Sequence, residues 1–285
     1  MTTKVEAGEF RTGQRAQWNT AASGWKSWSP LIDKGAARVS ERLVELARVA
    51  SGDRVLDVAT GYGEPALTAA KRVGPEGEVV ATDIAAEMLA FGRERAAEAG
   101  LENVRFVEAD AASLDFSEGS FDAALSRWGI IFEPEPEAAA ARIRTFLRPG
   151  ARMAISSWGP IDRAPMFALT MGTLMERLQV PPPAPGTPGP LARPTHDAIA
   201  ALLEGGGFSN VEVEDIDVVW EYSSPDEFVT CLRDIAPPIT ALLAEYPREV
   251  QDEAWVAITE AARERAGGDG PFQLSNQALL AAGDA

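Results

Sequence analysis

Residues 54–73 have the sequence RVLDVATGYGEPALTAAKRV, and this stretch decides how the rest of the chain is interpreted. RVLDVA has the apolar run of a buried strand, GYGEPA is a turn with two glycines, and ALTAAKRV has the composition of a helix. Glycines in such a turn permit positive φ and let the backbone approach a ligand, while the following helix offers unpaired N–H groups. The stretch therefore predicts a strand–turn–helix unit that holds a ligand.

Strand-like and helix-like segments alternate around this unit. The predicted strands are 54–59, 78–83, 104–110, 121–126 and 151–158, and the predicted helices between them cover about 65–72, 85–99 and 136–147. Apolar runs with little alternation are typical of strands covered on both faces. The pattern predicts an α/β protein with a doubly wound, mostly parallel sheet.

The flanking regions have a different rhythm. A helix is expected at about 36–49, after a polar start, and further helices at 167–178, 196–208, 225–243 and 248–266; a long alternating strand is expected at 211–222 and a last strand at 273–283. We therefore expect an N-terminal helical lid in residues 1–50 and a core in residues 51–160. Residues 161–285 are expected to supply a substrate-capping insertion and the C-terminal part of the sheet.

Composition limits the classes of partner. The 285 residues include 26 Lys and Arg against 43 Asp and Glu, for a net charge of −17, and no basic run is present that would attract nucleic acid. No secretion signal and no apolar run of about 18 residues is found. The single cysteine, Cys231, cannot form an internal disulfide and is expected in the core. These features favour a cytoplasmic protein without stable membrane association.

The glycine turn fits two kinds of adenosine-bearing ligand. GYGEPA satisfies the dinucleotide pattern G-x-G-x-x-A, and Asp83 follows where a ribose-binding carboxylate belongs. A dinucleotide brings a pyrophosphate, which the nearby Asp57 would repel, whereas an amino group or a sulfonium would be attracted. The turn therefore favours S-adenosylmethionine over a nicotinamide dinucleotide.

Residues 55 to about 158 resemble the class I S-adenosylmethionine-dependent methyltransferases, in the branch that includes the ubiquinone and menaquinone C-methyltransferases. The resemblance rests on DVATGYG, ATDIAAEML, VEADAASL and LRPGARMAISSW, in this order. It implies a Rossmann-like, seven-stranded, mostly parallel sheet with an antiparallel last strand. The one departure is Ala59, which stands where the family's motif has its first glycine and which reduces the room for the ligand slightly.

The resemblance also implies which residues hold S-adenosylmethionine, with S-adenosylhomocysteine as the product. Asp83 would bind the ribose hydroxyls, Ile84 and Met88 would pack on adenine, and Asp110 would accept from the adenine amino group. On spacing alone, Ile84 and Met88 are equally consistent with ordinary core positions. The complete expected set is Asp57, Ala59, Thr60, Gly61, Gly63, Asp83, Ile84, Met88, Asp110, Ala111 and Ser126.

Aromatic residues gather where the methyl acceptor is expected, because ligands of open parallel sheets bind at the carboxyl ends of the strands. The expected acceptor residues are Trp18, Trp25, Trp28, Arg127, Trp128, Phe132, Trp158 and Trp220. The N-terminal tryptophans could equally form the buried face of a lid helix. No NPPY-type or DPPY-type segment follows the fourth strand, as enzymes that methylate bases would require. The expected acceptor is a small, partly apolar molecule: an isoprenoid, a quinone or phenol, or another secondary metabolite, with transfer to carbon favoured over oxygen or nitrogen.

Three residues are candidates for catalytic roles. Arg127 directly follows a strand and is suited to an anionic group of the acceptor, although an ion pair with Glu133 or Glu135 is an alternative. Glu176 and His196 are candidates for a general base, with a solvated helix face and a helix-cap position as their alternatives. One His, one Cys and no clustered carboxylates predict no metal site.

Two functions from other classes stay open. One is a nicotinamide-dependent oxidoreductase, and the other is a non-catalytic module that binds S-adenosylmethionine. A homo-oligomer is also compatible with the sequence.

Overall fold

In a computed structural model that describes residues 4–184 and 186–285, seven strands form one sheet in the order β3-β2-β1-β4-β5-β7-β6. Strands β1 to β5 are parallel, and β7 runs antiparallel to both of its neighbours, β5 and β6. The prediction of a Rossmann-like sheet with an antiparallel last strand is confirmed. The strands are β1 Arg54–Val58, β2 Glu78–Asp83, β3 Val104–Glu108, β4 Phe121–Arg127, β5 Leu147–Trp158, β6 Ser209–Tyr222 and β7 Phe272–Asp284.

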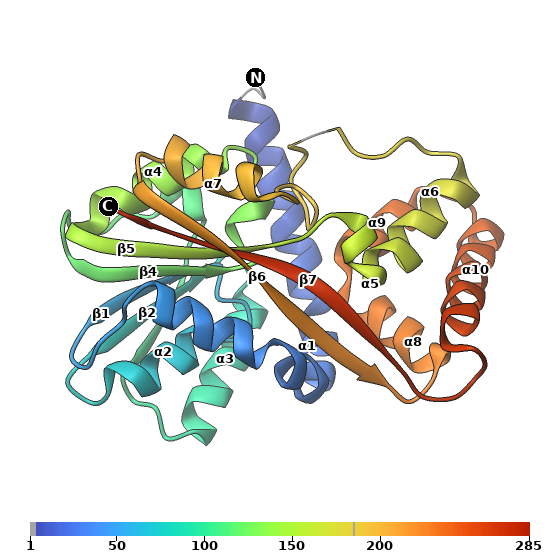
Figure 1. The fold of residues 1–285 in the computed structure, drawn as a ribbon, viewed down its shortest axis with the longest axis horizontal. Coiled ribbons are helices and arrows are strands. Elements are labelled where there is room, and N and C mark those ends of the chain that lie inside the picture. The colour runs from blue at the N-terminus through green and yellow to red at the C-terminus, as the bar shows by residue number, and fades with distance from the viewer. Residues whose placement is uncertain (1–3, 185) are drawn as a thin grey trace.

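Helices cover both faces of this sheet, which gives three layers (Figure 1). One face packs against α1 Lys4–Leu46, α2 Ala66–Val73 and α3 Ala86–Glu98, and the other against α4 Pro136–Phe146 and α7 His196–Gly205. Because successive strand residues alternate between the faces, Val55 and Leu125 belong to the first core and Leu56 and Ala124 to the second. Both faces of the central strands β1, β2, β4 and β5 are therefore buried, as their apolar sequences predict, whereas the edge strands β3 and β6 are partly exposed.

The remaining helices gather at the far end of the long β6–β7 ribbon, beside the sheet (Figure 1). They are α5 Pro165–Phe167, α6 Thr173–Leu178, α8 Pro225–Ile235, α9 Pro237–Ala244 and α10 Arg248–Ala266, with a π-helical segment, η4, at Ala168–Gly172. Three 3-10 turns complete the structure: η1 Ala111–Ser113, η2 Ile130–Phe132 and η3 Ile161–Arg163. In the described part of the chain, no helix has the length and apolar character needed to cross a membrane.

Two helix predictions are wrong in extent. The helix expected at 36–49 begins at Lys4 and continues for 43 residues, through Pro30. Its N-terminal half has few apolar residues per turn, so no strong periodicity marks it. The helix expected at 225–243 is two helices, because Pro237 and Pro238 lack N–H donors and end α8 before α9 begins.

The segment after β5, which was expected to form a substrate-capping insertion, does not form one continuous cap. Within the region expected to select the substrate, Ile161 to Tyr222, helix α7 packs on α4, β6 and β7, and β6 pairs along β7. These two elements belong to the sheet layers. The parts that can cover a ligand are therefore α5–α6 with η4, and the later pair α8–α9.

Candidate active site

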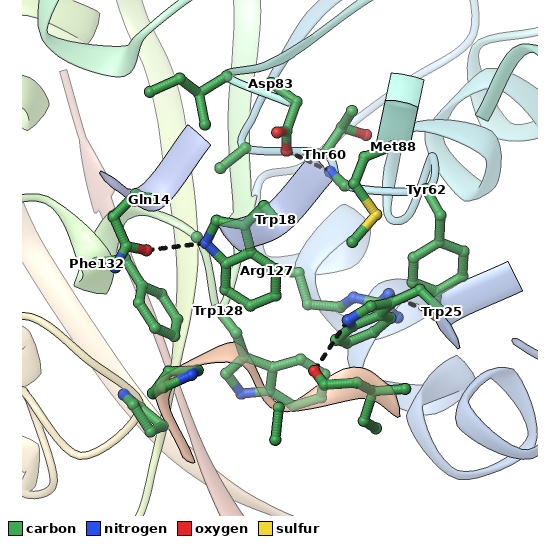
Figure 2. A pocket seen from close by; sticks show the side chains of 18 of the residues that line it. Gln14, Trp18, Trp25, Thr60, Tyr62, Asp83, Met88, Arg127, Trp128 and Phe132 are labelled. Atoms are coloured by element: carbon green, nitrogen blue, oxygen red, sulfur yellow. Dashed lines mark hydrogen bonds between the residues drawn. The ribbon is translucent and has the colours of Figure 1, made fainter. Parts of the chain in front are cut away.

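A cavity of about 240 Å³ lies at the carboxyl ends of β1, β2, β4 and β5. In the sheet order, β1 and β4 are neighbours, and the chain crosses from one half of the sheet to the other between them. Ligands of open α/β sheets bind at such a point. Figure 2 shows that side chains from α1, from the glycine turn and from the ends of β2 and β4 point into the same space.

The glycine turn and Asp83 form one wall of the cavity. Asp83 Oδ2 accepts the N–H of Gly61 at 2.7 Å, and Oδ1 accepts the N–H of Ala85 at 2.8 Å. Burial raises the pKa of Asp83 to about 6, although these N–H groups lower it. Gly61 has φ 56, and a Cβ placed on it would meet no atom within 4 Å. The wall thus has a fixed carboxylate and open space beside it, which suits a ribose.

Asp57 lies behind the turn and is not part of the cavity wall. Its Oδ2 accepts the Thr60 hydroxyl at 2.6 Å and the N–H of Ala66 at 3.0 Å, while Oδ1 is buried without a partner. Burial raises the pKa of Asp57 to about 7. Asp57 therefore connects the glycine turn to the start of α2. It does not face the cavity, so it would not contact a ligand bound there.

The end of the cavity where the resemblance places adenine, called the adenine end below, is formed by the residues that follow β2 and β3. Ile84, Met88 and Ala111 line the cavity, whereas Asp110 does not. Asp110 Oδ1 accepts the N–H of Ala112 at 2.9 Å, and Oδ2 lies 3.4 Å from Arg11 Nε of helix α1. Arg11 Nε also lies 3.2 Å from Glu133 Oε2. The α1 helix is thus ion-paired across the adenine end.

Two further residues of the expected cofactor set lie outside the cavity wall. Gly63 has φ 102, a value that favours glycine, and it packs beneath the turn against Leu67. Ser126 is fully buried in β4 and its Oγ accepts the N–H of Ile130 at 3.0 Å. Both residues shape the backbone around the site. Ala59 and Thr60 do line the cavity.

Helix α1 covers the cavity with one stripe of side chains. The stripe consists of Phe10, Arg11, Gln14, Trp18, Trp25 and Ile32. Trp18 Nε1 donates to Gln14 Oε1 at 2.9 Å, and Trp25 Nε1 donates to the carbonyl of Ile235 at 3.0 Å (Figure 2). Trp28 was expected to contact the acceptor, but it faces away from the cavity and donates to Asp234 Oδ2 at 2.8 Å. Trp28 therefore ties the lid to α8.

Aromatic rings line the opposite end of the cavity. Trp128 is stacked on Trp158 with centroids 4.3 Å apart and 5° between the planes, and Trp158 packs against Trp220 at 5.6 Å. Phe132 meets Trp18 edge-on at 5.5 Å. Apolar residues of α5, α8 and α9 complete this end: Met166, Phe167, Leu232, Ile235 and Ile239. The surface suits a flat or branched apolar molecule.

Arg127 lies between the two ends and is 7% exposed. Nη1 donates to Ser40 Oγ at 2.9 Å, and Nη2 donates to the hydroxyl of Tyr62 at 3.1 Å. The alternative of an ion pair with Glu133 or Glu135 is wrong, since Glu133 pairs with Arg11. Arg127 is thus a buried cation that faces the cavity.

The two base candidates are not at the site. Glu176 is exposed on α6, and His196 is exposed at the start of α7, where Nε2 lies 2.6 Å from Asp215 Oδ1. Neither lines the cavity. A carboxylate and an imidazole can each take a proton, but the folding of α6 and α7 turns these two side chains to solvent.

Sequence reasoning missed several cavity residues. Tyr62 stands between the two glycines of the motif, at a position where the family pattern specifies no residue type. Glu64, Gln14, Arg11 and Glu133 also line the cavity. A lid helix that carries the N-terminal tryptophans was one of the alternatives, but only the spacing of Arg11, Gln14 and Trp18 on one helical face could have indicated the whole stripe.

Comparison with known proteins agrees with this geometry. Residues 55–150 match the family model described as "Methyltransferase domain". The chain is 35% identical over 140 residues to the ubiquinone/menaquinone biosynthesis C-methyltransferase UbiE of Pseudomonas putida. The aligned residues make up 48% of this chain and 55% of the relative. The chain thus spans about half the length of the curated relatives that it matches.

Solved structures with low identity share the fold. The 4+2 cyclase SpnF is 19% identical with a TM-score of 0.53, over 93% of this chain and 95% of that one. A phosphoethanolamine N-methyltransferase from Haemonchus contortus, crystallised with S-adenosyl-L-methionine, is 20% identical with a TM-score of 0.51, over 87% of this chain and 52% of that one. Residues 55–150 thus match a methyltransferase domain in sequence, and these solved structures show that the chain as a whole shares the fold of such proteins.

Proposed function

We propose that the protein transfers the methyl group of S-adenosylmethionine to a small, partly apolar acceptor. The observation that carries the proposal is that one cavity joins the glycine turn and Asp83 at one end to an aromatic, apolar surface at the other. A donor and an acceptor bound in these two places would meet inside the same enclosed space. Holding two reactants in such a geometry can supply a large part of the rate enhancement of a displacement reaction.

The donor end fits an adenosyl group. The Asp83 oxygens each accept one backbone N–H and have lone pairs left for ribose hydroxyls. Ile84 and Met88 would contact the adenine ring, and the open space at Gly61 would let the ligand lie close to the protein backbone. S-adenosylmethionine, when bound, supplies an electrophilic methyl group on a sulfonium, and S-adenosylhomocysteine is the product that leaves.

The acceptor end supports an apolar molecule with an anionic group. Trp128, Trp158 and Trp220 offer ring faces to an aromatic or isoprenoid body, and the Arg127 cation would pair with a phenolate, carboxylate or diphosphate. The Pseudomonas putida relative is named as a C-methyltransferase of ubiquinone and menaquinone biosynthesis. We therefore favour a quinone-like or phenolic acceptor and transfer to carbon.

In such a transfer the protein mainly positions the reactants and excludes water. Arg127 would stabilise a phenolate, whose negative charge makes the neighbouring ring carbon nucleophilic. The carbon–methyl bond would form as the sulfur–methyl bond breaks with its electron pair on sulfur, and the displaced ring proton would leave to solvent. The α1 stripe would keep water from the sulfonium during the displacement.

Two other functions have less support. A nicotinamide-dependent oxidoreductase would need an acid/base group near the hydride, and His196, the only histidine, lies outside the cavity. A module that binds S-adenosylmethionine without methyl transfer stays open, since one fold can host several activities. Cytoplasmic location and the oligomeric state remain predictions that need separate measurement.

Calorimetric titration tests the donor part. Wild-type protein should bind S-adenosylmethionine and S-adenosylhomocysteine and should not bind NAD, and Asp83→Ala should lose most of the adenosyl affinity. Transfer of labelled methyl to a panel of phenols, quinols and isoprenoids then tests the acceptor part. Binding of NAD in place of the adenosyl ligands would refute the proposal.

A further inference from the structure

Arg127 is held in the cavity wall by two neutral hydroxyl groups. Its guanidinium donates to Ser40 Oγ and to the Tyr62 hydroxyl, at 2.9 and 3.1 Å. Among the side chains that the structure describes, none places a carboxylate oxygen within 4.0 Å of this guanidinium. A buried cation without an ion pair is costly, and the negative charges of Glu64 and Asp33, which raise the pKa of Arg127 from beyond ion-pair distance, offset this cost only in part.

The Tyr62 hydroxyl is oriented by a second partner. It donates its proton to Asp33 Oδ1 at 2.9 Å, so only its oxygen lone pairs face Arg127. Asp33 Oδ2 in turn lies 2.5 Å from Arg95 Nη2. The negative charge of Asp33 is therefore already paired with Arg95, and it acts on Arg127 from a distance without forming an ion pair.

Packing fixes the Tyr62 ring as well. The ring lies parallel to Phe91 within 15°, with centroids 6.1 Å apart, and its centroid is 5.4 Å from that of Trp25. Figure 2 shows Tyr62, Trp25 and Arg127 on one side of the cavity. Since Tyr62 also belongs to the glycine turn, one side chain connects the donor wall to the Arg127 cation.

Three elements distant in sequence build this arrangement. Asp33 and Ser40 come from α1, Tyr62 from the turn after β1, and Arg127 from the end of β4. An arrangement that removes an arginine from water, fixes its direction and leaves its charge unpaired is suited to bind an anion that enters the cavity.

We propose that Tyr62 is a positioning residue that, with Ser40, fixes the Arg127 guanidinium as the binding site for a carboxylate or phenolate in the cavity. The inference rests on the proposed function for the identity of the ligands, because the anionic group can come from two sources. One source is the carboxylate of the donor's amino-acid part, and the other is the acceptor.

Two matched pairs of ligands test the site and separate the sources. S-adenosylhomocysteine carries the amino-acid carboxylate and 5′-methylthioadenosine lacks it, while 2-naphthoate is an anion and 2-naphthamide is its neutral counterpart. Affinities are measured by calorimetry and by tryptophan fluorescence on wild-type protein, Tyr62→Phe and Ser40→Ala. Tyr222→Phe is the matched control, since it removes a buried phenol hydroxyl that does not line the cavity.

We expect Tyr62→Phe and Ser40→Ala each to weaken one anionic ligand about tenfold and to leave its neutral counterpart unchanged, since hydrogen bonds to charged groups contribute strongly. Loss confined to S-adenosylhomocysteine assigns the site to the donor, and loss confined to 2-naphthoate assigns it to the acceptor. S-adenosylhomocysteine also carries an amino group that 5′-methylthioadenosine lacks. The variants leave the surroundings of this group unchanged, so its contribution cancels when each variant is compared with the wild type.

Equal losses for the charged and neutral ligands would show that Tyr62 is merely structural and would overturn the inference. Unchanged affinity for both anions in Tyr62→Phe would overturn it too. Failure of wild-type protein to bind S-adenosylhomocysteine would instead refute the proposed function, and the naphthoate pair would still test the Arg127 site.

Discussion

A Cβ placed on Gly129 would lie 2.4 Å from the Cβ of Ala59. Ala59 stands where the methyltransferase motif has its first glycine, and it has φ 57, a left-handed value that non-glycine residues seldom adopt. The motif alone predicts that Ala59 reduces the room for the ligand. In the structure, the absence of a side chain at Gly129 makes room for the Ala59 methyl group. Gly129, just after β4, therefore compensates for the alanine that replaces the motif's first glycine just after β1.

Gly129→Ala should therefore destabilise the protein by about 2 kcal/mol, because an added methyl group would overpack this point. The double variant Ala59→Gly, Gly129→Ala should recover at least about half of this loss. The recovery is expected to be incomplete, because the new Cβ would still lie 3.0 Å from Ser126 Oγ and 3.1 Å from the carbonyl of Val58. Urea unfolding of both variants provides the measurement. A double variant as unstable as Gly129→Ala would show that Ala59 is not the cause.

The affinity for S-adenosylhomocysteine should depend on pH through Asp83. Its pKa is raised to about 6, chiefly by burial, and a ribose hydroxyl donates to the ionised carboxylate more favourably than to the protonated acid. Affinity should be highest above about pH 7 and fall roughly tenfold between pH 7 and pH 5. Asp83→Asn should bind weakly and lose most of this pH dependence. Calorimetric affinities that stay constant down to pH 5 would argue against ribose binding by Asp83.

Asp83, together with Asp57, should also make the stability of the ligand-free protein depend on pH, and this stability should fall as the pH rises. The folded-state pKa values, about 7 for Asp57 and about 6 for Asp83, exceed the ordinary value of 3.8. Their contribution to the free energy of unfolding is then greatest below about pH 4 and is lost as the pH rises through 6 and 7. Asp57→Asn and Asp83→Asn should each reduce this loss in urea unfolding between pH 5 and pH 8, provided that the folded structure is kept.

The fold and the donor half of the site were predictable because their signals are local. Apolar runs and glycine or proline stops mark β1 to β5, and the motif residues from Asp57 to Asp83 lie within two strand–helix units. The acceptor half depends on tertiary packing. Ser40 and Asp33 reach Arg127 and Tyr62 only because a 43-residue helix crosses the cavity, and the amphipathic pattern marks only the last part of that helix, from about residue 36. Gly129 could not be linked to Ala59 for the same reason.

Arg11→Ala should loosen the N-terminal end of the lid. Arg11 is the cation between Asp110 and Glu133, and the pKa of Glu133 is already raised by burial and by Asp110. Removing Arg11 would leave two carboxylates facing each other beside the adenine end. We expect S-adenosylhomocysteine to dissociate about tenfold faster in stopped-flow fluorescence, with a smaller effect on association.

Lys34→Ala is the matched control for Arg11, because it removes one positive charge from the same helix at an exposed pair with Glu221. Its dissociation rate should equal that of the wild type. If both variants dissociate equally fast, the effect reflects net charge, and the ion pairs at the adenine end do not hold the lid closed.

Glu176→Gln and His196→Ala should keep methyl transfer within about twofold of the wild-type rate, although both residue types are common general bases. Glu176 is exposed on α6, and His196 contacts Asp215 on β6 at the surface. Neither can reach a group in the cavity while the fold stays as it is. Arg127→Gln, measured beside them, should lose at least about tenfold in kcat/KM, because the anion that it binds would remain unpaired in an apolar space. A large loss in Glu176→Gln alone would mean that α6 closes over the cavity during turnover.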